Sequence, residues 1–412
     1  MKVVVLGAGV IGVATAYWLQ RQGHEVEVIE RQPAAALETS FANGGIIHVG
    51  EAGPFSKPGA PTSILRWLGQ EDAPMLLRYG AVPKMWRWGV EFLRNCTQAR
   101  HLANRSSNLG LALESLAALR EIRAQTGIAY DESVQGSILI CHDAKALEEA
   151  GRYFLPMAEE GLAVEVVDGE RARTIEPALA GAAVPVEGGI FFPEDEAGDC
   201  HKFTRGLAAW CAAQGVRFRY GATIERLELE AGTVRGVATD QGRIAADAVV
   251  VCMGSYSAPF LRPYGIRLPI YPVKGVTVTM PRDAWPEAPR TTILNDGYFF
   301  AVTPLGDRLR LAGSAEVAGW DTTPSPARCK AIFERACSVF PALRACYDPA
   351  TAQHWAGLRP VMPHGRPAIG ASRLGGLFLN TGHGHLGWTL ACGSGKVLAR
   401  RLTEGRAEAA GA

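Results

Sequence analysis

Residues 2–12 read KVVVLGAGVIG, and this stretch decides the fold class of the chain. Residues 2–6 form a short β-branched run of the kind found in buried parallel strands. The spacing of apolar residues predicts a helix over 10–22, and the alternation over 25–30 predicts a second strand. A strand, a glycine-rich turn, a helix and a strand in this order predict a βαβ unit.

The glycines of this stretch form the G-x-G-x-x-G pattern of dinucleotide-binding turns. Gly7 would make the tight turn, Gly9 would let the backbone approach a pyrophosphate, and Gly12 would let the helix pack closely on the strand. The helix N-terminus would then face the phosphates with its free N–H groups. Glu30 ends the second strand, where an acid binds a ribose 2′-hydroxyl and disfavours the 2′-phosphate of NADP. The sequence therefore predicts dinucleotide binding.

A second glycine cluster, near the C-terminus, favours FAD over NAD. Gly382, Gly384 and Gly387 follow a predicted strand over 377–380 and precede a predicted helix that reaches about residue 402. A helix N-terminus carries exposed N–H groups and partial positive charge. Such a helix end suits the negative charge that develops on a reduced flavin.

The composition excludes several classes of protein. The chain has 412 residues, 48% of them apolar, and a net charge of +1, so two or three domains are expected and a polyanionic partner such as nucleic acid is not. The nine cysteines form no Cys-x-x-Cys pair, and we predict reduced thiols and no metal site. We see no secretory signal and no apolar run of membrane-spanning length, and we therefore expect a cytoplasmic protein.

The organisation of the chain points to a domain assembled from separate pieces. The pattern predicts helices over 101–126, 144–160, 201–214 and 326–339, strands over 134–141, 186–192 and 247–254, a three-strand meander over 216–220, 223–230 and 233–239, and antiparallel strands within 266–320. The fold class is therefore α/β, with a Rossmann-like FAD-binding domain built from 1–50, 180–258 and 352–412. Residues 51–179 and 259–351 would form a discontinuous antiparallel-sheet substrate domain, the α+β part of the fold.

Residues 54–100 differ from the rest of the chain. They are rich in proline and tryptophan and contain seven basic and three acidic residues. Indole and guanidinium groups suit the headgroup region of a membrane, so the segment is a candidate for peripheral membrane contact on the side of a quinone acceptor. A lid over the pocket or a contact within an oligomer explains the same composition equally well.

The whole chain resembles the FAD-dependent oxidoreductases of the D-amino acid oxidase superfamily, and among them the bacterial quinone-dependent D-amino acid dehydrogenases. The resemblance rests above all on VVVLGAGVIGVATAYWL from residue 3, ALETSFANGG from residue 36, HWAGLRPVMPHGRPAIG from residue 354 and LNTGHGHLGWTLACGSG from residue 379. It implies non-covalent FAD and oxidative deamination of D-amino acids to 2-oxo acids and ammonia, by hydride transfer from Cα to flavin N5. It also implies a quinone or another non-oxygen electron acceptor, and attachment to the inner face of the cell membrane.

The resemblance also assigns cofactor-binding positions. The residues for the pyrophosphate would be Gly7, Gly9, Val10, Ile11 and Gly12. The residues for the adenosine side would be Glu30, Arg31 and Ile224, with Gly254 and Ser255 closing the nucleotide site. The residues along the flavin would be Ser40, Asn43, Gly44, Gly45, Gly357, His383, Gly384, His385, Leu386, Gly387, Trp388 and Thr389.

The substrate side is expected around Arg359, which matches the arginine that binds the substrate carboxylate in the resembled family. A guanidinium binds a carboxylate through two parallel hydrogen bonds, which lysine cannot do; a structural ion pair is the competing interpretation. Tyr298 matches a tyrosine that helps to bind the carboxylate, although packing in the core explains it equally well. No obligate general base is evident.

The chain departs from the resembled family after Gly45. His48 and Glu51 replace small or aromatic residues near the expected pocket entrance, and His364 replaces a common Asp. We therefore keep His48 and Glu51 as candidate substrate contacts and a cyclic imino acid, D-proline or hydroxy-D-proline, as an alternative substrate. The sequence is also compatible with an oxygen-using amine, glycine or sarcosine oxidase of the same fold, and with a flavin-carrying subunit of a larger electron-transfer complex.

Overall fold

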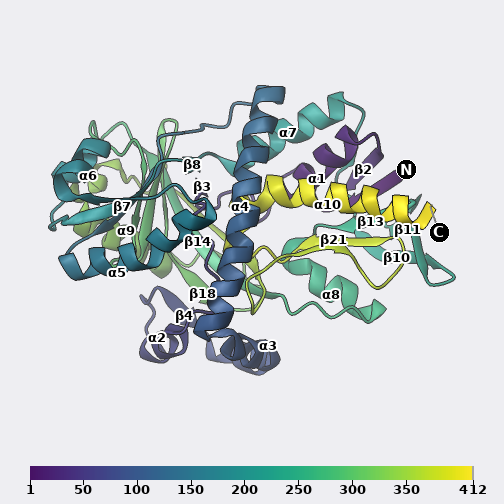
Figure 1. Ribbon diagram of the computed structural model, residues 1–412, viewed down its shortest axis with the longest axis horizontal. Coiled ribbons are helices and arrows are strands. Elements are labelled where there is room, and N and C mark those ends of the chain that lie inside the picture. The colour runs from purple at the N-terminus through teal and green to yellow at the C-terminus, as the bar shows by residue number, and fades with distance from the viewer. Residues whose placement is uncertain (411–412) are drawn as a thin grey trace.

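The computed structural model describes the backbone of residues 1–410 and the side chains of residues 1–404. It has two main sheets in separate lobes, and helix α4 (Gln98–Thr126) runs between them (Figure 1). The first sheet has six strands in the order β20-β21-β13-β1-β2-β9, and the second has ten strands. This is the mixed α/β fold that the sequence predicts.

The six-stranded sheet contains the predicted βαβ unit. Strand β1 (Lys2–Leu6) pairs in parallel with β2 (Glu25–Ile29) on one side and with β13 (Ala248–Val251) on the other, and α1 (Val10–Arg21) connects the first two. The buried faces of β1 and β13 are entirely apolar, as expected for a parallel sheet covered on both sides. The remaining strands of this sheet are β9 (Arg217–Arg219), β20 (Ala368–Ala371) and β21 (Leu377–Thr381).

Different elements cover the two faces of this sheet. Helices α7 (Cys200–Ala213) and α10 (Gly387–Ala410) pack beside α1, and Figure 1 shows α10 lying across this lobe. On the opposite face, the small sheet β10 (Ile224–Glu230), β11 (Thr233–Thr239) and β12 (Gly242–Ala245) packs its apolar side chains against those of β1, β13 and β21. Helix α8 (Ser257–Leu261) follows β13.

The predicted meander is wrong in its first strand. Residues 217–219 pair in parallel with β2 as the edge strand β9 of the six-stranded sheet, and the third strand of the meander is β12, which was not predicted. The reason is the preceding helix α7, since a strand that returns through a helical crossover lies parallel to its neighbour. Arg219 of β9 then pairs with the buried carboxylate of Glu27 on β2.

The ten-stranded sheet forms the other lobe. Its strands run in the order β4 (Met75–Leu77), β18 (Ala315–Val317), β14 (Tyr271–Pro281), β17 (Arg308–Ala312), β16 (Phe300–Leu305), β15 (Thr292–Asn295), β5 (Ser137–Cys141), β7 (Gly188–Phe192) and β6 (Glu165–Asp168), with β19 (Gln353–Val361) paired to β14. Helices α5 (Ala144–Phe154), α6 (Gly169–Ile175) and α9 (Pro326–Val339) belong to this lobe (Figure 1). Strands β7 and β19 therefore lie in this sheet, although their residues fall in ranges expected for the FAD-binding domain. Strands β3 (Ile46–Ile47) and β8 (Glu196–Ala197) pair with each other and form a separate two-stranded sheet.

Helices α2 (Ala60–Arg66) and α3 (Val82–Asn95) project from the lower edge of the molecule in Figure 1. Of the 14 large apolar side chains that are exposed among the described residues, eight fall between residues 65 and 102. They are Leu65, Leu68, Tyr79, Val82, Trp86, Val90, Leu93 and Leu102. No helix within the described residues combines the length and the apolar character needed to cross a bilayer.

Candidate active site

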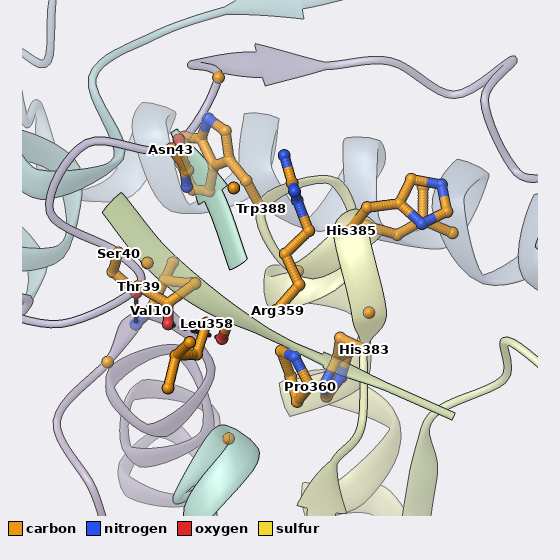
Figure 2. Close-up of a pocket in the computed structure, with 18 of the residues that line it drawn as sticks. Val10, Thr39, Ser40, Asn43, Leu358, Arg359, Pro360, His383, His385 and Trp388 are labelled. Carbon is orange, nitrogen blue, oxygen red and sulfur yellow. Dashed lines mark hydrogen bonds between the residues drawn. The ribbon is translucent and has the colours of Figure 1, made fainter. Parts of the chain in front are cut away.

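A cavity of about 700 Å³ lies where the two lobes meet. Its walls are formed by the N-terminus of α1, the segment 38–51, the end of β13, strand β19 and the start of α10 (Figure 2). Nearly all of the residues assigned to FAD or substrate from the sequence line this one cavity. Segments from both ends of the chain and from its middle therefore meet there.

The turn before α1 and the first turn of that helix each require a glycine. A Cβ atom on Gly7, which has φ of +101°, would lie 2.8 Å from the carbonyl oxygen of Cys252, and a Cβ on Gly12 would lie 1.9 Å from the carbonyl oxygen of Gly7. Gly9, the N-cap of α1, has no side chain to cover the helix end, and Gly9, Val10 and Ile11 line the cavity. The Val10 N–H donates to Ser40 Oγ at 3.0 Å, which anchors the segment 38–45 against this helix end.

Glu30 and Arg31 line the end of the cavity next to β2. The Glu30 carboxylate accepts the N–H groups of Ala8 and Gln32, at 2.8 and 2.9 Å, and burial raises its pKa. Arg31 pairs with Glu38 and stacks on the ring of Tyr256 at 3.9 Å. Ile224, Gly254 and Ser255 complete this end of the wall.

A buried arginine, Arg310, bonds the backbone of the loop that contains Asn43, Gly44 and Gly45. Arg310 Nη1 donates to the carbonyl of Asn43 at 3.1 Å, and its guanidinium also lies 3.4 Å from Asp199. Both Arg310 and Asp199 are buried. This pair was not predicted because an isolated Arg in a strand and an Asp before a helix carry no shared pattern.

The 3-10 turn before α10 and the first turn of that helix place three polar side chains around the cavity (Figure 2). His383 Nε2, His385 Nε2 and Trp388 Nε1 are buried and have no hydrogen-bond partner among the described residues. Burial lowers the pKa of both histidines to about 3, so their rings are neutral. Buried polar atoms of this kind are normally satisfied, and these three therefore fit a polar aromatic ligand such as the flavin of FAD.

Arg359 extends from β19 into the centre of the cavity (Figure 2). Its guanidinium lies flat on Gly275, where a Cβ atom would come within 2.3 Å of Nη1, and Nη1 donates to the carbonyl of Ser314 at 2.8 Å. Among the side chains that the structure describes, no carboxylate pairs with Arg359, and burial lowers its pKa to about 10. It is thus a cation at neutral pH with free donors and no anion beside it.

His48 and Glu51 also line the cavity. His48 Nδ1 lies 2.5 Å from the buried carboxylate of Asp195, a residue that was not singled out from the sequence. Glu51 Oε1 lies 3.9 Å from His385 Nε2. Burial and the nearby charge of Asp296 raise the pKa of Glu51.

Two of the predicted residues do not line the cavity. Gly12 lies behind Gly7, where its role is the close packing described above. Tyr298 packs edge-on against His142, with ring centroids 5.1 Å apart, and its N–H donates to Asn295 Oδ1. Phe299, at a φ of +54°, reverses the chain direction, so Asp296, Phe299 and Phe300 line the cavity instead of Tyr298. The Asn-Asp-Gly sequence at residues 295–297 is typical of a turn, and it was the signal in the sequence that could have predicted this change of direction.

A model of the family described as FAD dependent oxidoreductase (DAO) matches residues 2–401. The chain belongs to this family. A D-amino acid dehydrogenase of Rhizobium rhizogenes is 45% identical over 408 residues, which cover 99% of this chain and 97% of the relative. A D-amino acid dehydrogenase of Phenylobacterium zucineum is 47% identical over 399 residues, covering 97% and 93%.

Solved structures support the fold of this oxidoreductase. Glycine oxidase from Bacillus cereus superposes with a TM-score of 0.76 at 24% identity, covering 98% of this chain and 97% of that one. L-proline dehydrogenase from P. horikoshii superposes with a TM-score of 0.77 at 19% identity, covering 98% and 93%. FAD is the cofactor, in agreement with the family and with the unpartnered donors around the cavity.

Proposed function

We propose that this protein is an FAD-dependent D-amino acid dehydrogenase that oxidises D-amino acids to 2-oxo acids and ammonia. The proposal is supported by the activity named for relatives that are 45–47% identical over nearly the whole chain. The observation that carries it is Arg359, a cation in the centre of the cavity for which the described residues provide no paired carboxylate. Such a group selects a substrate with a carboxylate.

The flavin supplies N5 as the acceptor of the hydride that leaves Cα. We propose that the open N-terminus of α1 holds the pyrophosphate, Glu30 the ribose, and the start of α10 the edge of the flavin, all without a covalent bond. Arg359 then holds the substrate carboxylate, so that the position of Cα is fixed relative to the flavin. The lobe of the six-stranded sheet would thus bind the cofactor, and the lobe of the ten-stranded sheet would supply the substrate wall.

Anaerobic bleaching of the bound flavin tests this proposal. The purified yellow protein is mixed with a panel of D- and L-amino acids under nitrogen, and loss of the flavin absorbance is followed. Bleaching by D-amino acids alone supports the proposal, whereas bleaching by L-amino acids or by neither series refutes it. Dye reduction without peroxide formation in air separates a dehydrogenase from an oxygen-using oxidase, and activity of the isolated chain dismisses a requirement for a larger complex.

A second candidate substrate class is favoured by His48 and Glu51 in the cavity wall. These polar side chains suit a ring hydroxyl or ring nitrogen, so D-proline or hydroxy-D-proline is the alternative to a simple D-amino acid. Steady-state rates for D-alanine, D-proline and hydroxy-D-proline in the native protein and in His48→Ala decide between them. An unchanged ranking of substrates in the variant would remove this second class.

We propose that electrons pass to a quinone in the cell membrane, and that the face of α2 and α3 docks on the inner surface of an anionic bilayer. The exposed apolar side chains of this segment lie among basic residues, a combination that binds anionic lipid surfaces. The same segment reaches the cavity, because Phe55 stacks on His385 at 4.2 Å and Trp67 packs edge-on against Phe299 at 5.5 Å. A docked bilayer would therefore adjoin the cavity mouth.

Sedimentation with vesicles tests the docking proposal. The native protein should sediment with vesicles that contain phosphatidylglycerol and much less with vesicles of phosphatidylcholine alone. The double variant Trp86→Ser/Leu93→Ser should stay in the supernatant, while Val134→Ser, which removes an equally exposed apolar side chain elsewhere, should behave as the native protein does. Equal recovery of all variants in the supernatant would instead favour a lid or a contact between copies of the chain.

A further inference from the structure

The carboxylate of Asp195 is buried and collects three donors from distant parts of the chain. Asp195 follows β7 and is 2% exposed. Its Oδ1 accepts the N–H of Val49 at 2.9 Å, and its Oδ2 accepts the Ser137 hydroxyl and lies beside His48 Nδ1, both at 2.5 Å. No arginine or lysine side chain among residues 1–404 pairs with it. A buried carboxylate costs several kcal/mol unless it is bonded in this way. Within residues 1–404, His48 is its one ionisable partner.

The ring of His48 is fixed in one orientation. It packs edge-on against Phe192, with centroids 4.6 Å apart, and a Cβ atom on Gly50 would lie 2.9 Å from His48 Cε1. The N–H of His48 donates to Thr389 Oγ1 at 3.3 Å. Because Nδ1 faces Asp195 and His48 lines the cavity, Nε2 is the nitrogen left for a ligand there.

Three charged groups face His48, and each comes from a different loop. Asp195 lies between β7 and β8, Glu51 lies on the loop of His48 itself, and Asp296 lies between β15 and β16. His385, in the 3-10 turn before α10, also faces it and is neutral. Burial alone would lower the pKa of His48, but the charge and hydrogen bond of Asp195, together with Glu51 and Asp296, raise it.

A D-amino acid in water carries an ammonium group, which has no lone pair to support the departure of a hydride from Cα. Building on the function proposed above, we propose that His48 Nε2 accepts the proton that this ammonium must lose, and that Asp195 is the positioning residue that holds His48 for this step. One ammonium N–H bond breaks, and an N–H bond forms at Nε2. The freed lone pair would form the second bond of C=N when bound FAD takes up the hydride from Cα, and hydrolysis of the imine by water would give the 2-oxo acid and ammonia.

The dependence of kcat/KM on pH tests this proposal in the holoenzyme. With a base present, kcat/KM should rise with pH along a limb that lies below the ammonium pKa of the free substrate. In His48→Asn, whose amide can still donate to Asp195, the limb should move up to the substrate's own pKa, and kcat/KM at neutral pH should fall about 10²–10⁴-fold. His101→Asn, which removes another buried imidazole, is the matched control and should leave the limb in place.

A spectroscopic measurement separates positioning from folding. In the ¹⁵N-histidine spectrum of the holoenzyme, one titrating resonance should vanish in His48→Asn and should titrate at lower pH in Asp195→Asn. If Asp195→Asn loses its flavin, Asp195→Glu replaces it and should restore part of the native titration. An unmoved kinetic limb in His48→Asn would overturn the proposal, as would a limb that moves only in Glu51→Gln. If no D-amino acid bleaches the flavin, the proposed function is refuted instead. The histidine titration is measured without substrate, so its outcome does not depend on that result.

Discussion

Replacement of Arg359 gives the sharpest test of the substrate site. Nη1 of Arg359 donates to the carbonyl of Ser314, and no carboxylate among the described residues pairs with the guanidinium, so its other N–H groups are free for the substrate. Two charge-assisted hydrogen bonds are worth about 1.5–3 kcal/mol each. Arg359→Ala should therefore lose about 3–6 kcal/mol of transition-state stabilisation, which corresponds to a 10²–10⁴-fold fall in kcat/KM.

Arg359→Lys should fall between the native protein and the alanine variant, because the cation remains while the paired geometry is lost. The assay is anaerobic stopped-flow reduction of the flavin over a range of D-alanine concentrations. Arg366→Ala removes an exposed arginine from the same stretch of chain and should change kcat/KM little. A fall of less than tenfold in Arg359→Ala, with native flavin content, would refute the assignment of Arg359 to the substrate carboxylate.

Three further predictions concern stability and cofactor retention. Gly12→Ala places a Cβ atom 1.9 Å from the Gly7 carbonyl oxygen and should lower the Tm and release flavin during gel filtration, whereas Gly89→Ala, with open space around it, should do neither. Asp199→Asn removes the buried partner of Arg310 and should lower the free energy of unfolding by about 3–5 kcal/mol in a denaturant titration; a change below about 1 kcal/mol would contradict this. The hydrogen bond from Lys274 lowers the pKa of Asp321 from 3.8 to about 2. The ion pair therefore contributes fully to the stability of the fold above pH 3.8, and this contribution is lost as the pH falls toward 2. Acid unfolding curves of the native protein and Asp321→Asn should accordingly converge near pH 2, and a constant gap between them would contradict the assignment.

Much of the cofactor region could be predicted because its determinants are local in sequence. The run 2–12 specifies its own strand, turn and helix, and the contacts that require Gly7 and Gly12 to be glycine lie within the unit or against the adjacent strand β13. The cluster from His383 to Thr389 likewise combines a turn and a helix start in one stretch. Local spacing was therefore sufficient to predict that each of the two stretches forms a turn and the start of a helix.

The errors arose where a choice depended on partners far along the chain. Residues 217–219 have the same alternating pattern whether they pair with β10 or with β2, and only the crossover through α7 selects β2. Tyr298 and Phe299 are adjacent apolar aromatics, and only the turn at Asn295 decides which of them faces the cavity. A periodic pattern gives the type of an element but not its neighbour.

The sequence by itself determined the dinucleotide-binding unit and the choice of FAD, because short motifs carry both. The assignment of Arg359 to the substrate carboxylate came from the resemblance to a known family and remains a proposal. Only the tertiary structure decided that Asp195 holds His48 across 147 residues and that Arg310 supports the loop of Asn43 across 267. Neither pair has a fixed spacing, and each forms only when strands from separate parts of the chain pack around one cavity. The physical reason is that burial, which makes these charged contacts strong, is a property of the assembled fold and not of any segment.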